Sequence, residues 1–125
     1  MRPLVLLVDD SEDNRVTYGE YLVLSGYRVA VAADGQEAVT QARALLPDIV
    51  IMDLSLPVMD GCAATRAIKR DELTRGIPVV ALTGHVLASQ TSDARDAGCA
   101  EVLIKPCLPT ALLATLRDVL ARTLP

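Results

Sequence analysis

Five short apolar segments alternate with helix-like segments along this chain of 125 residues, and this alternation constrains the fold more than any other feature. The apolar segments span residues 4–8, 28–32, 49–52, 78–82 and 102–104. All but the second are apolar throughout, as expected of strands that are buried on both faces. Strands that alternate with helices form a parallel sheet covered by helices on both faces. The sequence therefore predicts an α/β fold with a doubly wound, five-stranded parallel sheet and five helices.

Capping and breaking residues mark the expected helices between these segments. Ser11 can cap a helix that runs to about Ser25, with Gly26 as its stop. Asp34 can cap a second helix, which ends before Pro47. The remaining helices are expected over residues 62–71, over residues 89–97 and from Pro109 onward.

In two of these helices, apolar residues recur at the helical spacing of three to four. This spacing predicts which side chains face the sheet. They are Ala38, Val39, Ala42 and Leu45 in the second helix, and Leu112, Leu113, Leu116, Val119 and Leu120 in the last.

Composition limits the classes of function. The net charge of −4 and the isoelectric point near 4.8 argue against direct binding to nucleic acid. The three cysteines, Cys62, Cys99 and Cys107, lack metal-ligand spacing and fit small core residues of a cytoplasmic protein with reduced thiols. No segment has the length of a membrane span or the pattern of a secretory signal. We expect one domain over residues 1–125, without an output domain in this chain.

Polar residues follow four of the five apolar segments directly. Asp9 and Asp10 follow the first segment, Asp53 the third, Thr83 the fourth and Lys105 the fifth. The carboxyl ends of parallel strands lie at one edge of a sheet, and ligands of open α/β sheets bind there. We therefore expect these five side chains to converge on a single spot.

The residue types at this spot predict a particular chemistry. Close carboxylates repel one another unless a cation lies between them, and an all-oxygen site suits Mg²⁺ or Mn²⁺. Aspartate is also a covalent nucleophile toward phosphorus, so Asp53 is the candidate acceptor of a phosphoryl group. Lys105 would pair with one phosphoryl oxygen, and Thr83 would donate a hydrogen bond to another.

Each of these residues alone has a plainer explanation. An aspartate pair after a strand often only caps a helix, and single polar residues at strand ends are common in turns. Their joint occurrence at four strand ends favours a phosphoryl site. A Mg²⁺-dependent phosphatase is disfavoured, because such enzymes resemble D-x-D-x-T after their first strand and Leu54-Ser55 supplies no second acid. A nucleotide-binding domain is disfavoured, because no glycine-rich loop follows the first segment.

Five segments of the chain, in order, resemble the receiver domains of two-component response regulators. They are LVLLVDD (4–10), PDIVIMD (47–53), LPVMDG (56–61), PVVALT (78–83) and IKP (104–106). The resemblance covers essentially the whole chain. It implies a flavodoxin-like receiver fold with strand order 2-1-3-4-5, an order known for such folds rather than worked out from this sequence.

The resemblance implies a role for each acidic residue. Asp53 would take a phosphoryl group from the phosphohistidine of a sensor histidine kinase or of a histidine phosphotransfer protein. Mg²⁺ would bind Asp10, Asp53 and the backbone carbonyl of Ser55, with Asp9 assisting through water. The domain would then switch the binding of a downstream effector protein or relay the phosphoryl group. It would not be an enzyme beyond its own phosphorylation and dephosphorylation.

The resemblance also makes Lys105 and Thr83 the phosphate contacts and implies a cis peptide before Pro106. The sequence alone could not predict that peptide, since only about 5–6% of X–Pro bonds are cis. The helix start over residues 10–15 looks most like receivers that act alone or are attached to hybrid kinases. The alternative is a pseudo-receiver, an interaction module that has lost the chemistry, and the complete set of site residues argues against it.

Three positions depart from the family pattern. Val102 stands where the family usually has Tyr or Phe, so an aromatic rotamer switch cannot operate here, and we hypothesise that the signal leaves through residues 83–89 alone. Gly84 and His85 follow, and His85 is either a plain loop residue or orients hydrolytic water. Cys107 replaces the bulky apolar residue usual after the Lys-Pro pair.

Overall fold

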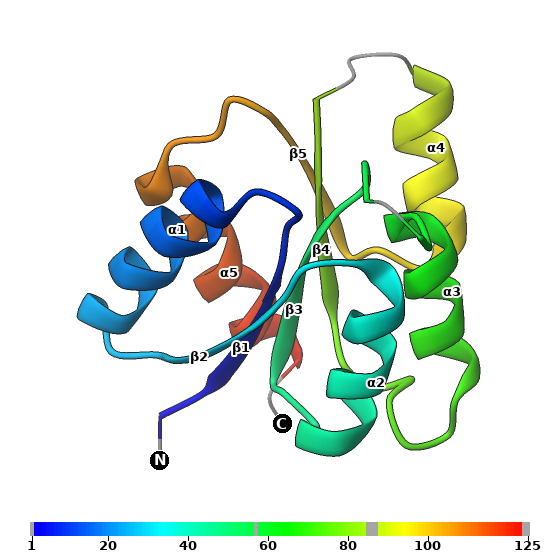
Figure 1. Ribbon diagram of the computed structural model, residues 1–125, viewed down its shortest axis with the longest axis horizontal. Helices are drawn as coiled ribbons and strands as arrows, with labels where there is room; N and C mark the ends of the chain where they lie inside the picture. The colour runs from blue at the N-terminus through cyan, green and yellow to red at the C-terminus, as the bar shows by residue number, and fades with distance from the viewer. Residues whose placement is uncertain (1, 57, 85–87, 124–125) are drawn as a thin grey trace.

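The computed structural model describes residues 2–56, 58–84 and 88–123. Strands and helices alternate along this part of the chain, as the sequence predicts (Figure 1). The elements are β1 Leu4–Val8, α1 Glu12–Leu24, β2 Arg28–Ala32, α2 Gly35–Leu45, β3 Ile49–Asp53, α3 Gly61–Arg70, β4 Val79–Thr83, α4 Ala88–Ala97, β5 Glu101–Ile104 and α5 Pro109–Thr123.

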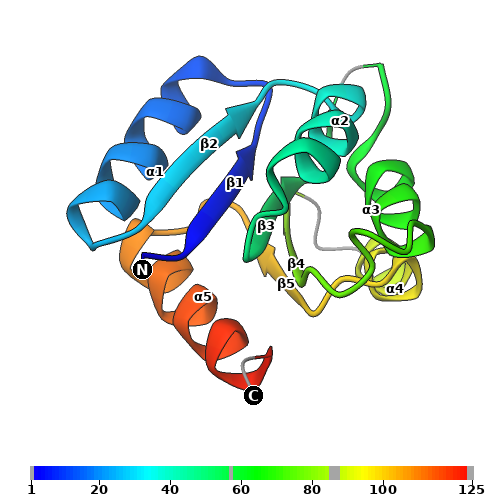
Figure 2. The same ribbon diagram turned by 90° about the horizontal axis from the view of Figure 1, so that it is seen from below.

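The strands form one parallel sheet in the order β2-β1-β3-β4-β5, which confirms the predicted architecture. Helices α1 and α5 cover one face of the sheet, and α2, α3 and α4 cover the other (Figures 1 and 2). The strand order reverses between β1 and β3, so the carboxyl ends of these two strands flank the crevice in which ligands of such sheets bind.

The central strands are buried on both faces, which explains why they are apolar at every position. In β1, Leu6 and Val8 pack into the core beneath α2 and α3, whereas Val5 and Leu7 pack into the core beneath α1 and α5. Successive side chains of a strand point to opposite faces, so one strand contributes to both cores. All five predicted inner residues of α5 are buried.

Side-chain caps fix where the helices begin. The Ser11 hydroxyl accepts a hydrogen bond from the Asn14 amide at 3.3 Å, and the Asp34 carboxylate accepts one from the Glu37 amide at 2.8 Å, so both predicted caps are confirmed. Helix α3 begins at Gly61, one residue earlier than expected, because Asp60 caps it. Strands β3 and β4 each extend one residue further than expected and so include Asp53 and Thr83.

The predicted inner face of α2 is wrong at one position. Ala38 and Ala42 are fully buried, and Val39 packs partly against the same core. Leu45, however, is 43% exposed. Residues 43–46 are all exposed, so the last turn of α2 lies outside the core and the helical period no longer predicts burial there.

The cysteines are free thiols, as the sequence predicts. Only Cys99 is a buried core residue, and burial raises the pKa of its thiol to about 11. Cys62 and Cys107 are only partly buried and pack against the edges of the two cores, so the prediction of core positions holds for them in part. Among the described helices, none combines the length and apolarity needed to cross a lipid bilayer.

Candidate functional site

The predicted site residues lie at one edge of the sheet because they end neighbouring parallel strands. Asp53 is the last residue of β3 and pairs in register with Leu82 of β4. Thr83 is the last residue of β4 and pairs with Ile104, immediately before Lys105. Asp9 follows β1, and its backbone amide donates to the carbonyl of Ala32 at the end of β2.

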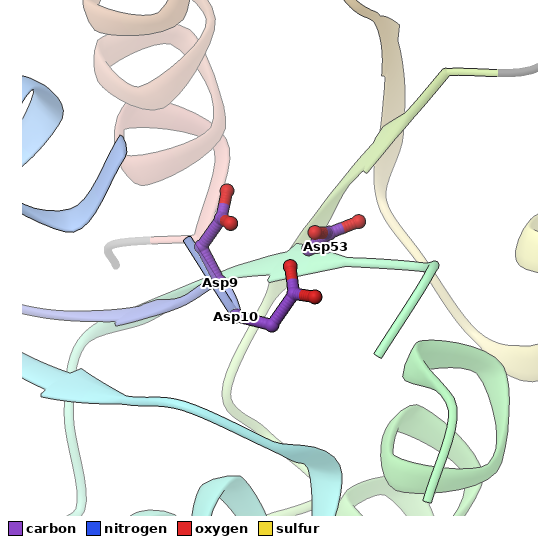
Figure 3. A group of neighbouring side chains, drawn as sticks. All are labelled: Asp9, Asp10 and Asp53. Atoms are coloured by element: carbon purple, nitrogen blue, oxygen red, sulfur yellow. The ribbon is translucent and has the colours of Figure 1, made fainter. Parts of the chain in front are cut away.

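Three carboxylates converge at this edge (Figure 3). Asp9, Asp10 and Asp53 each offer an oxygen, and these oxygens all lie within 4.8 Å of one another. Asp9 is 0% exposed and Asp53 is 2% exposed, whereas Asp10 is open to solvent. The donor set fits a hard divalent cation such as Mg²⁺, which prefers carboxylate oxygens and retains some water.

Lys105 lies between the two buried carboxylates. Its Nζ is 3.2 Å from Asp9 Oδ2 and 3.2 Å from Asp53 Oδ2. Partial burial alone would lower the pKa of Lys105, but the charges of Asp53 and Asp9 and the hydrogen bonds that they accept outweigh it and raise the pKa. Lys105 therefore carries its positive charge at neutral pH and offsets the repulsion between these carboxylates.

The Asp53 carboxylate has a second contact from the loop that follows β3. The Ser55 amide donates to Asp53 Oδ1 at 2.9 Å, and the Ser55 side chain is exposed. Gly61 packs directly on this strand end, since a Cβ at Gly61 would lie 2.7 Å from the Leu54 Cα and would also clash with the Asp53 carbonyl oxygen. The glycine after Asp60 is therefore required by close packing against the residue next to the site.

Two α1 residues that sequence reasoning missed contact Asp9. The Asn14 side-chain amide donates to Asp9 Oδ2 at 3.3 Å, and the Arg15 guanidinium donates to the Asp9 carbonyl at 2.7 Å. The Ser11 amide donates to Asp9 Oδ1 at 2.9 Å. The position of Asn14 in the first turn after the Ser11 cap is the one signal that could have indicated such a contact, because first-turn side chains lie beside the preceding loop.

A third α1 residue contacts the segment that follows β5. The Tyr18 hydroxyl donates to the Cys107 carbonyl at 2.7 Å, two residues after Lys105. Tyr18 is 9% exposed, and burial raises the pKa of its hydroxyl, which therefore stays protonated and able to donate. The Lys105–Pro106 peptide is cis, as the family resemblance implied.

Thr83 lies on the opposite side of the site, beneath α3 and α4. It is 1% exposed, and its carbonyl accepts a hydrogen bond from the Lys105 amide at 2.7 Å. A pocket of about 350 Å³ opens beside it. The lining residues are Leu54, Ser55, Asp60, Cys62, Arg66, Thr83 and Asp93.

The positions that depart from the family pattern fall in different surroundings. Val102 is partly buried and packs against the core beneath α3 and α4. Gly84 is exposed, and His85 lies outside the described residues, so its predicted role stays a prediction. The metal contact predicted for the Ser55 carbonyl also stays a prediction.

Comparison with known proteins shows which family this chain resembles. The chain matches the family model of the response regulator receiver domain over residues 5–117. The polar-differentiation response regulator DivK of Brucella ovis is 32% identical over 120 residues, which cover 96% of this chain and 98% of that protein.

Solved structures show the same fold. The chemotaxis response regulator CheY4 of Vibrio cholerae has a TM-score of 0.90 and 33% identity, covering 95% of this chain and 99% of that one. The receiver domain of the sensor histidine kinase PA1611 from Pseudomonas aeruginosa PAO1 has a TM-score of 0.84 and 36% identity, covering 98% of this chain and 97% of that one. That domain was solved with a magnesium ion coordinated in its active-site cleft. Sequence, fold and site agree that this chain belongs to the response regulator receiver domain family of two-component signalling.

Proposed function

We propose that this chain is a phosphoacceptor receiver, in which Asp53 takes a phosphoryl group from a phosphohistidine. The observation that carries the proposal is the placement of the Lys105 ammonium 3.2 Å from Asp53 inside a group of three convergent carboxylates. Phosphoryl transfer depends mainly on positioning and on neutralising charge, and this edge of the sheet supplies groups for both.

The proposed step forms a bond between an Asp53 carboxylate oxygen and phosphorus. The bond from phosphorus to the donor's imidazole nitrogen breaks, and the imidazole leaves with a proton from solvent. Lys105 leaves its ion pair with Asp53 and pairs with a phosphoryl oxygen. The Thr83 hydroxyl donates a hydrogen bond to another phosphoryl oxygen.

The acidic residues divide into two roles in this proposal. Asp10 and Asp53 hold Mg²⁺ together with the Ser55 carbonyl, and Asp9 acts through water. Mg²⁺, when bound, neutralises charge on the phosphoryl oxygens. The buried position of Asp9, whose oxygens already accept hydrogen bonds from Ser11, Asn14 and Lys105, supports an indirect role. Asp10 is exposed and has an oxygen within 4.8 Å of oxygens of Asp9 and Asp53, which supports a direct role.

The donor of the phosphoryl group is, in this proposal, a sensor histidine kinase or a histidine phosphotransfer protein. A shallow groove runs along α1 from Arg15, which contacts Asp9, to Leu24. Its exposed apolar side chains include Val16 and Val23, at 49% and 50% exposure. A helix of the donor protein packed on this groove would bring its phosphohistidine to the adjoining edge of the sheet.

The test is the intact mass after incubation with phosphoramidate, with and without Mg²⁺. Wild type and Asp96→Ala, which changes an exposed aspartate on α4, are expected to gain one phosphoryl group, and only with Mg²⁺. Asp53→Ala is expected to gain none. A phosphoryl gain by Asp53→Ala contradicts the assignment of the acceptor, and no gain by wild type favours an interaction module without the chemistry.

A further inference from the structure

One face of α1 contacts two segments of the site. Asn14 and Arg15 lie four and three residues before Tyr18, and residues at these spacings are neighbours on the surface of a helix. Their side chains donate hydrogen bonds to two segments that are far apart in the sequence, Asp9 after β1 and Cys107 after β5. These two segments carry Asp9 and Lys105, two of the charged groups of the site.

The contacts to Asp9 fix both its backbone and its carboxylate. Arg15 holds the carbonyl of Asp9 at 2.7 Å. Asn14 donates to Asp9 Oδ2 at 3.3 Å, the same oxygen that Lys105 approaches at 3.2 Å from the other side. With the Ser11 amide on Oδ1, three donors set the orientation of a carboxylate that is 0% exposed.

The contact from Tyr18 fixes the segment that carries Lys105. This segment is held at two points: the Lys105 amide donates to Thr83 of β4, and the Cys107 carbonyl accepts from Tyr18 of α1. The two points bracket Lys105, so the position from which its side chain reaches Asp9 and Asp53 depends on both. The aromatic ring alone would pack as well without its hydroxyl, so the hydroxyl has this hydrogen bond as its separate contribution.

We propose that Asn14, Arg15 and Tyr18 form a set of positioning residues, the α1 clasp. The clasp holds the segments of Asp9 and Lys105 at fixed positions relative to each other. Asn14 and Arg15 act through Asp9, and Tyr18 acts through the segment of Lys105. The proposal rests on the function proposed above, because it assigns Asp9 to the surroundings of the ion and Lys105 to the phosphoryl group. It predicts that the two halves of the clasp affect different measurable quantities.

Loss of the Asn14 contact is expected to weaken metal binding. Residues that orient the groups around a metal typically change its affinity by about 10- to 100-fold, so Asn14→Ala is expected to raise the Kd for Mg²⁺ about 10-fold. The unphosphorylated protein is titrated with Mg²⁺ in a calorimeter, without a phosphodonor. Thr17→Ala, an exposed position on the same helix, is the control and is expected to leave the Kd unchanged.

Loss of the Tyr18 hydroxyl is expected to slow phosphorylation without weakening metal binding. Tyr18→Phe removes only the donor to Cys107, and misplacing a reacting group by a fraction of an ångström lowers the rate by about 10-fold. The Kd for Mg²⁺ is expected to stay within about twofold, because Lys105 is no metal ligand. Tyr21→Phe is the matched control, since Tyr21 packs partly into the same core and its hydroxyl makes no hydrogen bond within the described part of the chain.

The backbone amide shifts of Lys105 and Leu108 supply a readout that needs neither metal nor phosphodonor. They are expected to move in Tyr18→Phe and to stay in place in Tyr21→Phe. The clasp is overturned if Tyr18→Phe keeps the wild-type rate and wild-type shifts, or if it loses rate and Mg²⁺ affinity together, which indicates general damage.

Failure of the proposed function gives a different pattern of results. A wild type that gains no phosphoryl group contradicts the phosphoacceptor proposal alone. The Mg²⁺ titration of Asn14→Ala and the amide shifts of Tyr18→Phe still decide whether the clasp holds Asp9 and the Lys105 segment.

Discussion

The two sides of the site are built differently. On the α1 side, donors from Asn14, Arg15 and Tyr18 hold the segments that follow β1 and β5. On the side of α3 and α4, buried Thr83 borders a pocket of about 350 Å³. Hydrogen bonds from α1 thus hold the segments of Asp9 and Lys105 on one side, which we call the tied side. The side of α3 and α4 borders the pocket, and we call it the open side.

This difference separates two requirements of a switch. The phosphoryl chemistry needs Asp9, Asp53 and Lys105 at fixed positions, and the contacts of the tied side hold the segments of Asp9 and Lys105. A change of shape needs room, and the open side borders Thr83, the first residue of the segment 83–89 through which we hypothesise that the signal leaves. With Val102 on β5 in place of an aromatic ring, that segment is the remaining candidate for movement. Identical backbone shifts of residues 83–89 in the free and phosphorylated protein would reject this hypothesis.

The largest expected effect concerns the cation on the tied side. Lys105→Ala removes the charge that lies 3.2 Å from Asp53, and loss of one such preorganised group typically lowers a rate by about 100-fold. The rate of phosphoryl gain from phosphoramidate is measured by intact mass. Arg117→Ala on α5 removes an exposed cation and is expected to leave the rate unchanged. Lys105→Arg tests geometry, because the planar guanidinium keeps the charge but cannot occupy the same position between two carboxylates. Equal rates for wild type and Lys105→Ala would mean that the tied side does not serve the chemistry.

Two glycines differ in the space around them: Gly61 packs on the end of β3, and Gly84 follows β4. An added Cβ at Gly61 would lie 2.7 Å from the Leu54 backbone, whereas one at Gly84 would meet nothing within 4 Å. Gly61→Ala is therefore expected to lower the free energy of unfolding by about 1–3 kcal/mol, and Gly84→Ala to change it by less than about 0.5 kcal/mol. Urea unfolding measures both. Similar values for the two variants would contradict the contrast between a closed end of β3 and an open end of β4.

The sequence predicts one part of this site well for a topological reason. Asp53 and Thr83 end their strands, Asp9 and Lys105 directly follow theirs, and parallel strands bring their carboxyl ends to one edge whatever the details of packing. Correct strand limits therefore suffice to place all four residues. The cis peptide at Lys105 is different, since only the family resemblance indicated it.

The α1 clasp could not be predicted in the same way. Whether Asn14 and Tyr18 reach Asp9 and Cys107 depends on how α1 is rotated and tilted on the sheet, and the apolar period fixes that rotation only coarsely. The error at Leu45 has a related cause. The helical spacing of the apolar residues correctly assigns Ala38 and Ala42 to the core, but it does not indicate that the last turn of α2 lies outside the core.

The smallest expected effect concerns the groove on the outer surface of the tied side. Val23→Asp places a charge among the exposed apolar residues of α1. A single apolar interface residue contributes about 1–2 kcal/mol to the binding free energy, which corresponds to about 10-fold in the transfer rate when docking limits transfer. Transfer from a phosphorylated histidine phosphotransfer protein is expected to slow by that factor, while phosphorylation by phosphoramidate stays unchanged. Leu73→Asp, which makes the same kind of change at a 61% exposed position between α3 and β4, is the control. If Leu73→Asp slows the protein donor and Val23→Asp does not, the donor docks away from α1, and the tied side then serves the chemistry alone.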